Sequence, residues 1–308
     1  MRLLAQVVGR EAAVLEMPLT ALQRAEIAFP RRGTDLEYVF KHVSMREVAY
    51  NTLVQKRRQE LHLATARAIA RLYPSDEYVE MIAYHFARTE EHGEAAGWLE
   101  KAGDRAAGVY ANDIAIDTYQ ESRKRLELSE AESTALARVD EKLGGVLATA
   151  ARYDEALEAL GRAAEVYRGL RDMEGLARVT ARIGWTHRWR GTPEEGITAI
   201  QPVLEVLAWA GPSQGLASLH LALAYLHFGS GEYQESLEAS QVAAELARAV
   251  GDERILGGSQ DATGKRVDHT WRDGGGHAFV RGIGAAAGES GGSGNPGDGP
   301  QQPGRRQR

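Results

Sequence analysis

Apolar and small residues recur at helical spacing through the middle of the chain, and the whole pattern repeats after about 40 residues. Four segments share a small residue at the start of a predicted helix, and another small residue lies twelve positions upstream of each. The first set comprises Ala115, Ala156, Gly196 and Ser236, and the upstream set comprises Gly103, Gly144, Gly184 and Ala224. This pattern predicts four pairs of helices over residues 94–252.

The small residues have a physical explanation in a pair of antiparallel helices. Two helices joined by a short turn pack closely when a small residue lies on each at their crossing, and apolar neighbours three and four positions away fill the seam. One pair cannot bury its apolar face alone, whereas stacked copies can. We therefore expect an all-α fold in which the helical hairpins stack into a solenoid.

The first 93 residues depart from this pattern. Residues 37–40 have strand-like character, with Val39 between two aromatic residues, and the chain then becomes helical at once. The helical pattern continues to Leu72 and is followed by Pro74, which stops a helix. We predict one short β-hairpin, one long amphipathic helix that ends at Leu72, and linking helices up to residue 93.

The repeat resembles the tetratricopeptide repeat. Leu143 and Gly144 match the start of that motif, and Tyr153, Ala156 and Leu160 match its aromatic, small and large positions. The usual tetratricopeptide unit has 34 residues, so the longer period here implies longer helices or longer loops between pairs. The resemblance also implies that the first helix of each pair lines a concave groove, which binds a protein or peptide partner.

A second resemblance covers about residues 5–250. It is to the region that follows the nucleotide-binding core in signalling ATPases of the AAA and STAND kind, many of which are linked to adenylate or guanylate cyclases or to transcription regulators. In that family a winged helix ends in a strand and is followed by a basic helix and then by repeats. The matching residues are Tyr38, Phe40, His42, Glu47, Val48, Ala49, Tyr50, Arg57, Arg58, Leu61 and His62.

This second resemblance implies an organisation for the whole chain. Residues 1–93 would form a partial winged helix plus linking helices, and residues 94–252 would form the repeats. The ATPase core would lie outside the chain, so we expect a fragment or a family member without its motor. The missing ATPase or output domains are then among the expected partners.

The C-terminal part is rich in glycine. Residues 257–308 hold 15 of the 34 glycines in the chain of 308 residues. Such a segment cannot bury enough apolar surface to offset the entropy lost on ordering. We therefore predict a disordered tail over residues 253–308, which leaves the last repeat without the polar cap that solenoids need.

Composition and motifs argue against catalysis. The absence of cysteine removes disulfides, thiolate metal sites and thiol nucleophiles. Residues 258–266 approach a phosphate-binding loop, but their glycines are one position too far apart. The glycines of residues 277–288 lack the helix that a dinucleotide fold requires, and the nine histidines show no metal-ligand spacing. We expect no enzyme activity, no cofactor and no metal.

The net charge and the hydropathy pattern bear on the cellular location of the protein and on the class of its partner. The net charge of −6 gives no overall basic field that would attract nucleic acid or anionic lipid. No apolar run approaches the roughly 20 residues that span a bilayer, and no signal-peptide pattern is present, so we expect a cytoplasmic protein. One basic cluster, Lys56 to Arg58, follows the predicted hairpin. Because a winged helix can bind DNA, a DNA-binding transcriptional regulator is the alternative function.

Aromatic residues gather on the first helices of the third and fourth pairs. On the first two pairs the groove-facing positions are polar or small, such as Glu100, Asp104 and Arg138. Binding hot spots favour Trp, Tyr and Arg, which bury much area for little lost entropy. The candidate partner-binding residues are Trp185, Arg188, Trp189, Leu221, Tyr225 and Phe228. The alternative interpretation is that these side chains pack between the pairs.

Together these patterns predict a non-catalytic protein–protein interaction scaffold. It would be the sensor and docking part of a cyclase- or regulator-linked signalling ATPase. Its partner would lie on the first helices of the last two pairs.

Overall fold

The computed structural model describes residues 1–262, except residues 33–35, 74–75, 208 and 210. Its elements up to residue 86 are α1 (Arg2–Val8), α2 (Ala12–Arg24), β1 (Ala28–Arg32), β2 (Leu36–Phe40), α3 (Val43–Asn51), α4 (Gln55–Leu72), a 3-10 turn (Asp76–Tyr78) and α5 (Val79–Phe86). The later elements are α6 (His92–Gly108), α7 (Asn112–Leu128), α8 (Ser133–Thr149), α9 (Tyr153–Leu170), α10 (Met173–Arg190), α11 (Pro193–Leu207), α12 (Gln214–Ser230), α13 (Tyr233–Val250) and α14 (Glu253–Ala262). Residues 263–308, with most of the predicted tail and the glycines of residues 277–288, lie outside the described residues.

A two-stranded antiparallel sheet lies near the N-terminus. β1 pairs with β2, so that Ala28 lies opposite Phe40 and Phe29 lies opposite Val39. The strand-like pattern of residues 37–40 therefore corresponds to β2, and the short β-hairpin predicted from the sequence is confirmed.

The helical stretch after the hairpin is divided in two, so the prediction of one long helix is wrong. α3 ends at Asn51 and α4 begins at Gln55, and Val54 between them has an extended backbone with φ −65° and ψ 153°. The guanidinium of Arg58 donates hydrogen bonds to the carbonyls of Leu53 and Asn51. These bonds satisfy acceptors that a helix end leaves unpaired. The sequence did not reveal the break because no glycine or proline marks it.

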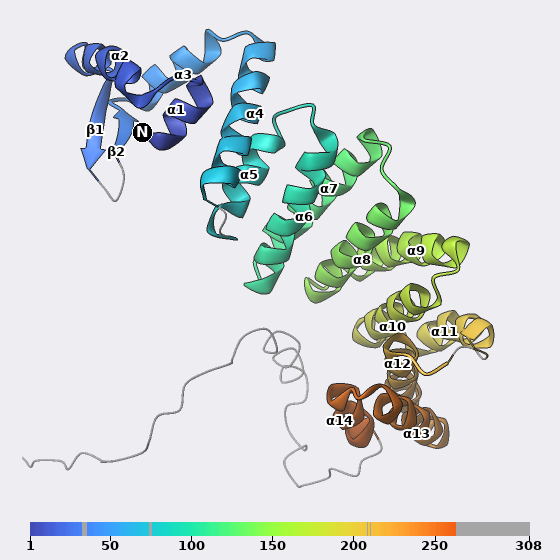
Figure 1. The fold of residues 1–308 in the computed structure, drawn as a ribbon. Coiled ribbons are helices and arrows are strands. Elements are labelled where there is room, and N and C mark those ends of the chain that lie inside the picture. Colours follow the sequence, from blue (N-terminus) through green and yellow to red (C-terminus); the bar gives the residue numbers. More distant parts are fainter. Residues whose placement is uncertain (33–35, 74–75, 208, 210, 263–308) are drawn as a thin grey trace, which may run out of the picture. The chain divides into compact units, whose positions relative to one another are not determined.

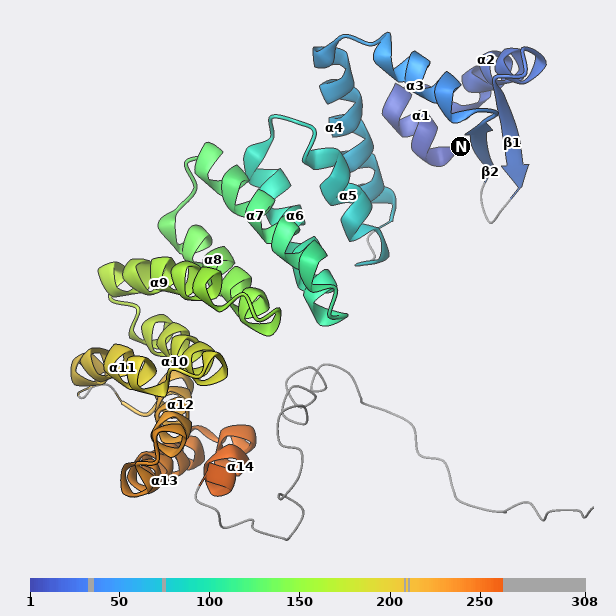
Figure 2. The same cartoon turned by 180° about the vertical axis from the view of Figure 1, so that it is seen from behind.

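The longer helices pack in pairs along the chain, α6 with α7, α8 with α9, α10 with α11, and α12 with α13 (Figures 1 and 2). The small residues of the repeat lie where the two helices of a pair meet. A Cβ atom added to Gly144 would lie 2.5 Å from Cγ of Leu160. One added to Gly184 would lie 2.7 Å from Cδ1 of Ile200. Glycine therefore sets the close approach of the helices, and the fold is the predicted solenoid of helical hairpins.

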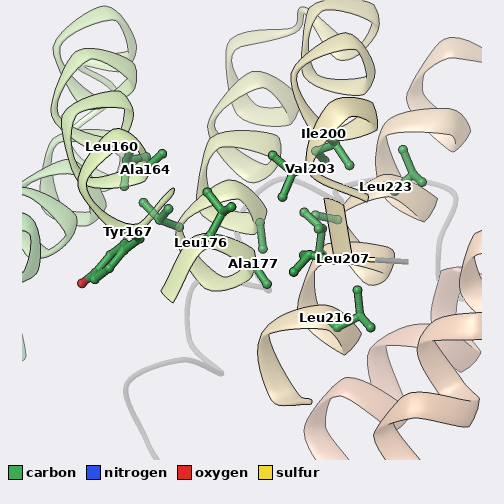
Figure 3. Packing of buried hydrophobic residues seen from close by; sticks show 14 of the residues in the cluster. Leu160, Ala164, Tyr167, Leu176, Ala177, Ile200, Val203, Leu207, Leu216 and Leu223 are labelled. Atoms are coloured by element: carbon green, nitrogen blue, oxygen red, sulfur yellow. The ribbon is translucent and has the colours of Figure 1, made fainter. Parts of the chain in front are cut away.

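Apolar side chains from successive pairs pack together in shared clusters. The cluster drawn in Figure 3 takes residues from α9, α10, α11 and α12. The labelled members are Leu160, Ala164, Tyr167, Leu176, Ala177, Ile200, Val203, Leu207, Leu216 and Leu223. Because this core crosses the boundaries between pairs, each pair depends on its neighbours for burial, as expected of stacked repeats.

The last described helix, α14, packs on the fourth pair, so the prediction of disorder is wrong for residues 253–262. Oδ1 of Asp252 accepts a hydrogen bond from the backbone N–H of Ile255 at 3.0 Å and caps the helix. The side chain of Ile255 is buried. A Cβ atom added to Gly258 would lie 3.0 Å from Cδ2 of Leu221, so this glycine allows α14 to approach α12 closely. The sequence analysis had counted Gly258 among the glycines of the predicted disordered tail.

Candidate partner-binding face

The first helices of the four pairs, α6, α8, α10 and α12, contact one another through side chains on one side, which we call the first-helix face. Ion pairs join α6 to α8 and α8 to α10, and aromatic rings join α10 to α12. On α10, positions 178, 182, 185 and 189 are spaced by four, three and four residues. This spacing keeps their side chains on one side of a helix. The sequence had pointed to 185 and 189 but not to the arginines that precede them.

Glu100 on α6 is held by two cations from α8. Arg138 donates through Nε and Nη2 to the two carboxylate oxygens at 2.8 and 2.9 Å, and Nζ of Lys142 lies 2.7 Å from Oε1. Lys142 also reaches Oδ2 of Asp104 at 2.7 Å. Burial by itself raises the pKa of Glu100, but hydrogen bonds from Arg138 and Lys142 bring this pKa below its ordinary value. The charged carboxylate therefore ties α6 to α8.

The same arrangement recurs one repeat later. Glu141 on α8 accepts hydrogen bonds from Nε and Nη2 of Arg178 at 2.8 and 3.0 Å, and Nε of Arg182 lies 3.2 Å away. The hydroxyl of Tyr167 donates to the same carboxylate at 3.1 Å. Burial raises the pKa of Glu141, but the bonds from Arg178 and the positive charge of Arg182 lower it below the ordinary value. Two buried carboxylates thus link three successive first helices.

The series of ion pairs ends at α10. The positions one repeat unit beyond Glu141, Arg178 and Arg182 hold small residues, which are Ala181, Ser218 and Ala222. Aromatic contacts replace the ion pairs at this point. The ring of Trp185 lies 5.0 Å from that of Tyr225 on α12 and 6.3 Å from that of Trp189, measured between ring centroids. The first-helix face therefore changes from charged to aromatic along the chain.

Three of the six predicted binding residues take part in packing. Leu221 is 7% exposed and belongs to a cluster with Ile255 of α14. Tyr225 is half-buried, and its hydroxyl donates to the carbonyl of Gly258 at 3.3 Å. Trp185 is half-buried and packs against the same cluster. For these three side chains the packing alternative describes their surroundings, and Leu221 has little surface left for a partner.

Trp189 and Phe228 remain exposed on the first-helix face, by 41% and 48%. The ring of Phe228 lies edge-on to that of Tyr233, with centroids 5.6 Å apart, and Tyr233 is itself exposed. The sequence prediction did not include Tyr233, because this residue begins α13, a second helix, and the predicted binding residues all lie on first helices. We call these three exposed side chains, near the C-terminal ends of α10 and α12 and at the start of α13, the aromatic surface.

Arg188 lies beside this surface. Its side chain packs along α12, because Cδ and Nε would both be 3.7 Å from a Cβ atom added to Gly229. Its Nε is buried and has no hydrogen-bond acceptor among the described residues. Arg182 and Arg178, six and ten residues earlier on the same helix, are by contrast both paired with Glu141.

The basic cluster after the hairpin, Lys56 to Arg58, takes part in contacts within the chain. Arg57 pairs with Glu60 at 2.9 Å, and the guanidinium carbon of Arg58 lies 4.8 Å from the centroid of the Tyr50 ring. The hydroxyl of Tyr50 is 3.1 Å from Nε2 of His62 on α4. Residues that carry the winged-helix resemblance thus join α3 to α4. The DNA-binding alternative is not favoured, because two of the three cations in this cluster are already engaged within the chain.

The described residues contain neither a metal-ion cluster nor a helix fit to span a membrane. No three histidine, aspartate or glutamate side chains among them lie close enough together to hold a metal ion. Within the same residues, no helix combines the length and the apolar character that a membrane span needs.

Comparison with known proteins gives matches at the level of structure. No protein-family profile matches the sequence, and a search of curated proteins gives no significant match. The apo form of RapI has a TM-score of 0.54 at 14% identity, covering 73% of this chain and 78% of that chain. A Rap protein in complex with Competence and Sporulation Factor has a TM-score of 0.51 at 14% identity, covering 70% of this chain and 60% of that chain.

A third match comes from a repeat protein. A variant of a putative kinesin light chain from Podosopora anserina, with nearly identical TPR-like repeats, has a TM-score of 0.50 at 13% identity. The match covers 69% of this chain and 99% of that chain. The chain is a tetratricopeptide-like helical solenoid. Identities this low establish the fold alone, and the chain spans less than two thirds of the Rap protein in the complex.

Proposed function

We propose that this chain is a non-catalytic protein–protein interaction scaffold, which binds a protein or peptide segment on the first-helix face at α10 and α12. The observation that carries this proposal is the exposure of Trp189 and Phe228 beside Arg188, whose Nε has no acceptor among the described residues. Exposed aromatic side chains next to an arginine have the composition of binding hot spots. Their burial by a partner would remove apolar surface from water.

The remainder of the first-helix face supports this proposal by providing a rigid base. The bidentate bonds of Arg138 to Glu100 and of Arg178 to Glu141 fix the spacing of α6, α8 and α10. A preformed surface loses less entropy on binding than one that must order first. A solved structure of similar fold, the Rap protein, is in complex with Competence and Sporulation Factor. A fold of this kind can therefore accommodate a bound partner.

A more specific part of the proposal concerns the larger protein to which this chain would belong. We place the chain as the sensor and docking part of a cyclase- or regulator-linked signalling ATPase, on the resemblance carried by residues 38–62. The hairpin β1–β2 and the contacts between α3 and α4 lie in this region. Sequencing the genomic DNA upstream of the Met1 codon tests this assignment. An in-frame nucleotide-binding core is expected, and an in-frame stop codon directly upstream would contradict it.

The binding proposal is tested by selecting short random peptides, displayed on phage, against the full-length chain. We expect enriched peptides that fail to bind the double variant Trp189→Ala/Phe228→Ala. The matched control is Trp209→Ala, because Trp209 is 96% exposed in the loop after α11 and lies outside the face. This control variant should still bind the selected peptides. Because the mutated residues Trp189 and Phe228 keep 41% and 48% of their surface exposed, the double variant should keep its melting temperature to within a few degrees.

Two outcomes would contradict the proposal. Peptides that bind the double variant as well as they bind the unmodified chain would place binding elsewhere. A large fall in the melting temperature of the double variant would show that Trp189 and Phe228 stabilise the fold, and that packing explains their presence.

A further inference from the structure

The arginines of the first-helix face fall into two groups. Arg138, Arg178 and Arg182 each lie within 3.2 Å of a buried carboxylate oxygen. Their charges are therefore balanced inside the chain and hold neighbouring helices together. Arg188 makes no ion pair with any described carboxylate, and its Nε is buried without an acceptor. One cation on this face thus lacks the partner that the others have.

The position of Arg188 in the repeat shows that it does not belong to the ion-pair series. Residues one and two repeat units earlier, Ala148 and Ala107, are small, and the residue one unit later is Phe228. In the ion-pair series an arginine pairs with a glutamate 37 or 38 positions earlier, and the corresponding positions for Arg188 are Ala151 and Ala150, which carry no carboxylate. The guanidinium of Arg188 therefore has no structural counterpart in the ion-pair series of the earlier pairs.

The surroundings of Arg188 are apolar and aromatic. Its stem lies along Gly229 of α12, and on α10 Trp185 and Trp189 lie three residues before it and one residue after it. The positive charge of Arg188 acts on the hydroxyl of Tyr225, where it opposes the rise in pKa caused by burial and by Asp261. An ionic bond formed in such a setting is strengthened, because flanking rings exclude water. A guanidinium also presents paired donors that match the two oxygens of a carboxylate.

We infer that the occupant of this surface is a segment of another protein that places a carboxylate on Arg188 and apolar side chains on Trp189 and Phe228. This inference rests on the proposed function and specifies the class of partner. Charge complementarity selects the carboxylate over a cationic group. In the ion-pair series, the four cations Arg138, Lys142, Arg178 and Arg182 face the three carboxylates of Glu100, Asp104 and Glu141. Arg188 adds to this positive excess, so an acidic segment is attracted along the face.

The experiment repeats the peptide selection on four full-length chains: unmodified, Arg188→Met, Arg188→Glu and the control Arg190→Glu. Arg190 is a suitable control because it lies on the same helix but pairs with Asp154 at 2.8 Å. We analyse the peptides whose binding depends on Trp189 and Phe228. On the unmodified chain and the control, these peptides should be enriched in Asp or Glu close to apolar residues. On Arg188→Glu the acidic preference should be replaced by Lys or Arg, and on Arg188→Met it should be lost.

The affinity of one selected peptide completes the test. Replacing its acidic residue by the matching amide should weaken binding to the unmodified chain by about tenfold or more, as expected for a charge-assisted bond. The same replacement should change binding to Arg188→Met by less than about twofold. Circular dichroism on each variant verifies that the fold is retained.

The possible results separate this inference from the proposed function. Aromatic-dependent peptides without acidic enrichment, or with an affinity unaffected by Arg188→Met, would overturn the carboxylate assignment and leave the scaffold proposal intact. The absence of any aromatic-dependent peptide would overturn both. A third result concerns the chain's own residues 267–273, which include Asp268 and Trp271. If the full-length variant Asp268→Asn/Trp271→Ala binds peptides at least about tenfold more tightly, the occupant is this segment and not another protein.

Discussion

At the scale of single residues, the close contact between helices is set by a few small side chains. Gly144 and Gly145 are neighbours on α8, but their surroundings differ. A Cβ atom on Gly144 would lie 2.5 Å from Cγ of Leu160 and 3.2 Å from the backbone carbonyl oxygen of Ala156. A Cβ atom on Gly145 would meet only the guanidinium end of Arg182, at 2.7 Å. The first contact involves buried core and backbone, and the second involves a flexible side chain.

This difference gives a matched pair of substitutions. Gly144→Ala should lower the free energy of unfolding by about 1–3 kcal/mol, because α8 and α9 must move apart to relieve the overlap. Gly145→Ala should change it by less than about 1 kcal/mol, since Arg182 can move and alanine favours the helix. Urea denaturation followed by circular dichroism measures both. Equal effects of the two substitutions would show that Gly144 does not limit the approach of the helices.

A second feature at this scale is a pair of histidines between α4 and α5. Nδ1 of His62 lies 2.9 Å from Nδ1 of His85, and the hydroxyl of Tyr50 lies 3.1 Å from Nε2 of His62. Two nitrogens this close require one donor and one acceptor, so the two imidazole rings cannot both be in the cationic form. Burial lowers the pKa of His62, and the charge of Arg88 lowers it further. Burial lowers the pKa of His85 to about 4, with added contributions from His62 and Arg88.

These pKa shifts predict a dependence of stability on pH. Between about pH 4 and pH 6.5 the unfolded chain binds more protons at His62 and His85 than the folded chain does. The free energy of unfolding should therefore fall as the pH drops through this window. His85→Gln should flatten the slope between pH 6.5 and pH 5, whereas the exposed His42→Gln should keep it. Urea denaturation at several pH values provides the measurement, and an unchanged slope in His85→Gln would contradict the prediction.

At the scale of elements, the repeats are held together by side chains that cross from one helix to another. Asp140 on α8 is buried and accepts hydrogen bonds from Arg123 on α7 and Arg162 on α9, the shortest to each being 3.0 and 2.6 Å. It therefore connects the first pair with the second. At the end of the described chain, α14 covers the apolar side of α12 and α13 and places Ile255 against Leu221. This helix takes the position of a cap on the fourth pair.

Truncation distinguishes the contribution of α14 from that of the residues after it. A chain that ends at Ala262 should keep the thermal midpoint of the full chain to within a few degrees. A chain that ends at Asp252 should melt several degrees lower, because Leu221 becomes exposed and the burial of Ile255 is lost. Each such side chain contributes about 1.5–3 kcal/mol when fully buried.

The single substitution Ile255→Ala in the full-length chain is the control for truncation. It should destabilise in the same direction as the shorter chain, by about 2–4 kcal/mol. Differential scanning calorimetry measures the midpoints of all four chains. A midpoint for the chain ending at Asp252 that matches the full chain would show that α14 does not act as a cap.

At the scale of the whole molecule, burial increases from the N-terminal elements into the repeats. α1 and α3 contain no buried residue, and α2 buries only Leu15 and Leu19. Helices α8, α10 and α12 each bury residues along most of their length. Regions with few buried apolar contacts open more readily than the global unfolding free energy requires. The N-terminal module, which comprises the elements from α1 to α3, should therefore be the least stable part of the described chain.

Hydrogen–deuterium exchange read by mass spectrometry tests this gradient. Amides of residues 1–36 should exchange rapidly, and those of the repeats, from about residue 94 onward to residue 252, should be protected, because apolar clusters cross from one pair to the next. Uniform protection from residue 5 onward would show that the N-terminal module is stable by itself and would contradict the prediction.

The sequence by itself determined the local features of this protein. Small residues at fixed spacing specified the helix pairs, because the close approach at Gly144 or Gly184 depends on side-chain size at that position. The strand-like run around Val39 likewise specified the hairpin. The change from charged to aromatic residues along the first helices was also visible, since helical periodicity projects positions onto a face without knowledge of the neighbours.

The tertiary structure decided everything that depends on which neighbour approaches. Leu221 and Phe228 have the same helical phase on α12, yet α14 covers the first and leaves the second exposed. Arg178 and Arg188 are both arginines of α10, yet only the first meets a carboxylate from the preceding pair. Periodicity gives the direction of a side chain, but the burial and pairing of that side chain depend on segments distant in the sequence, and these come together only on folding.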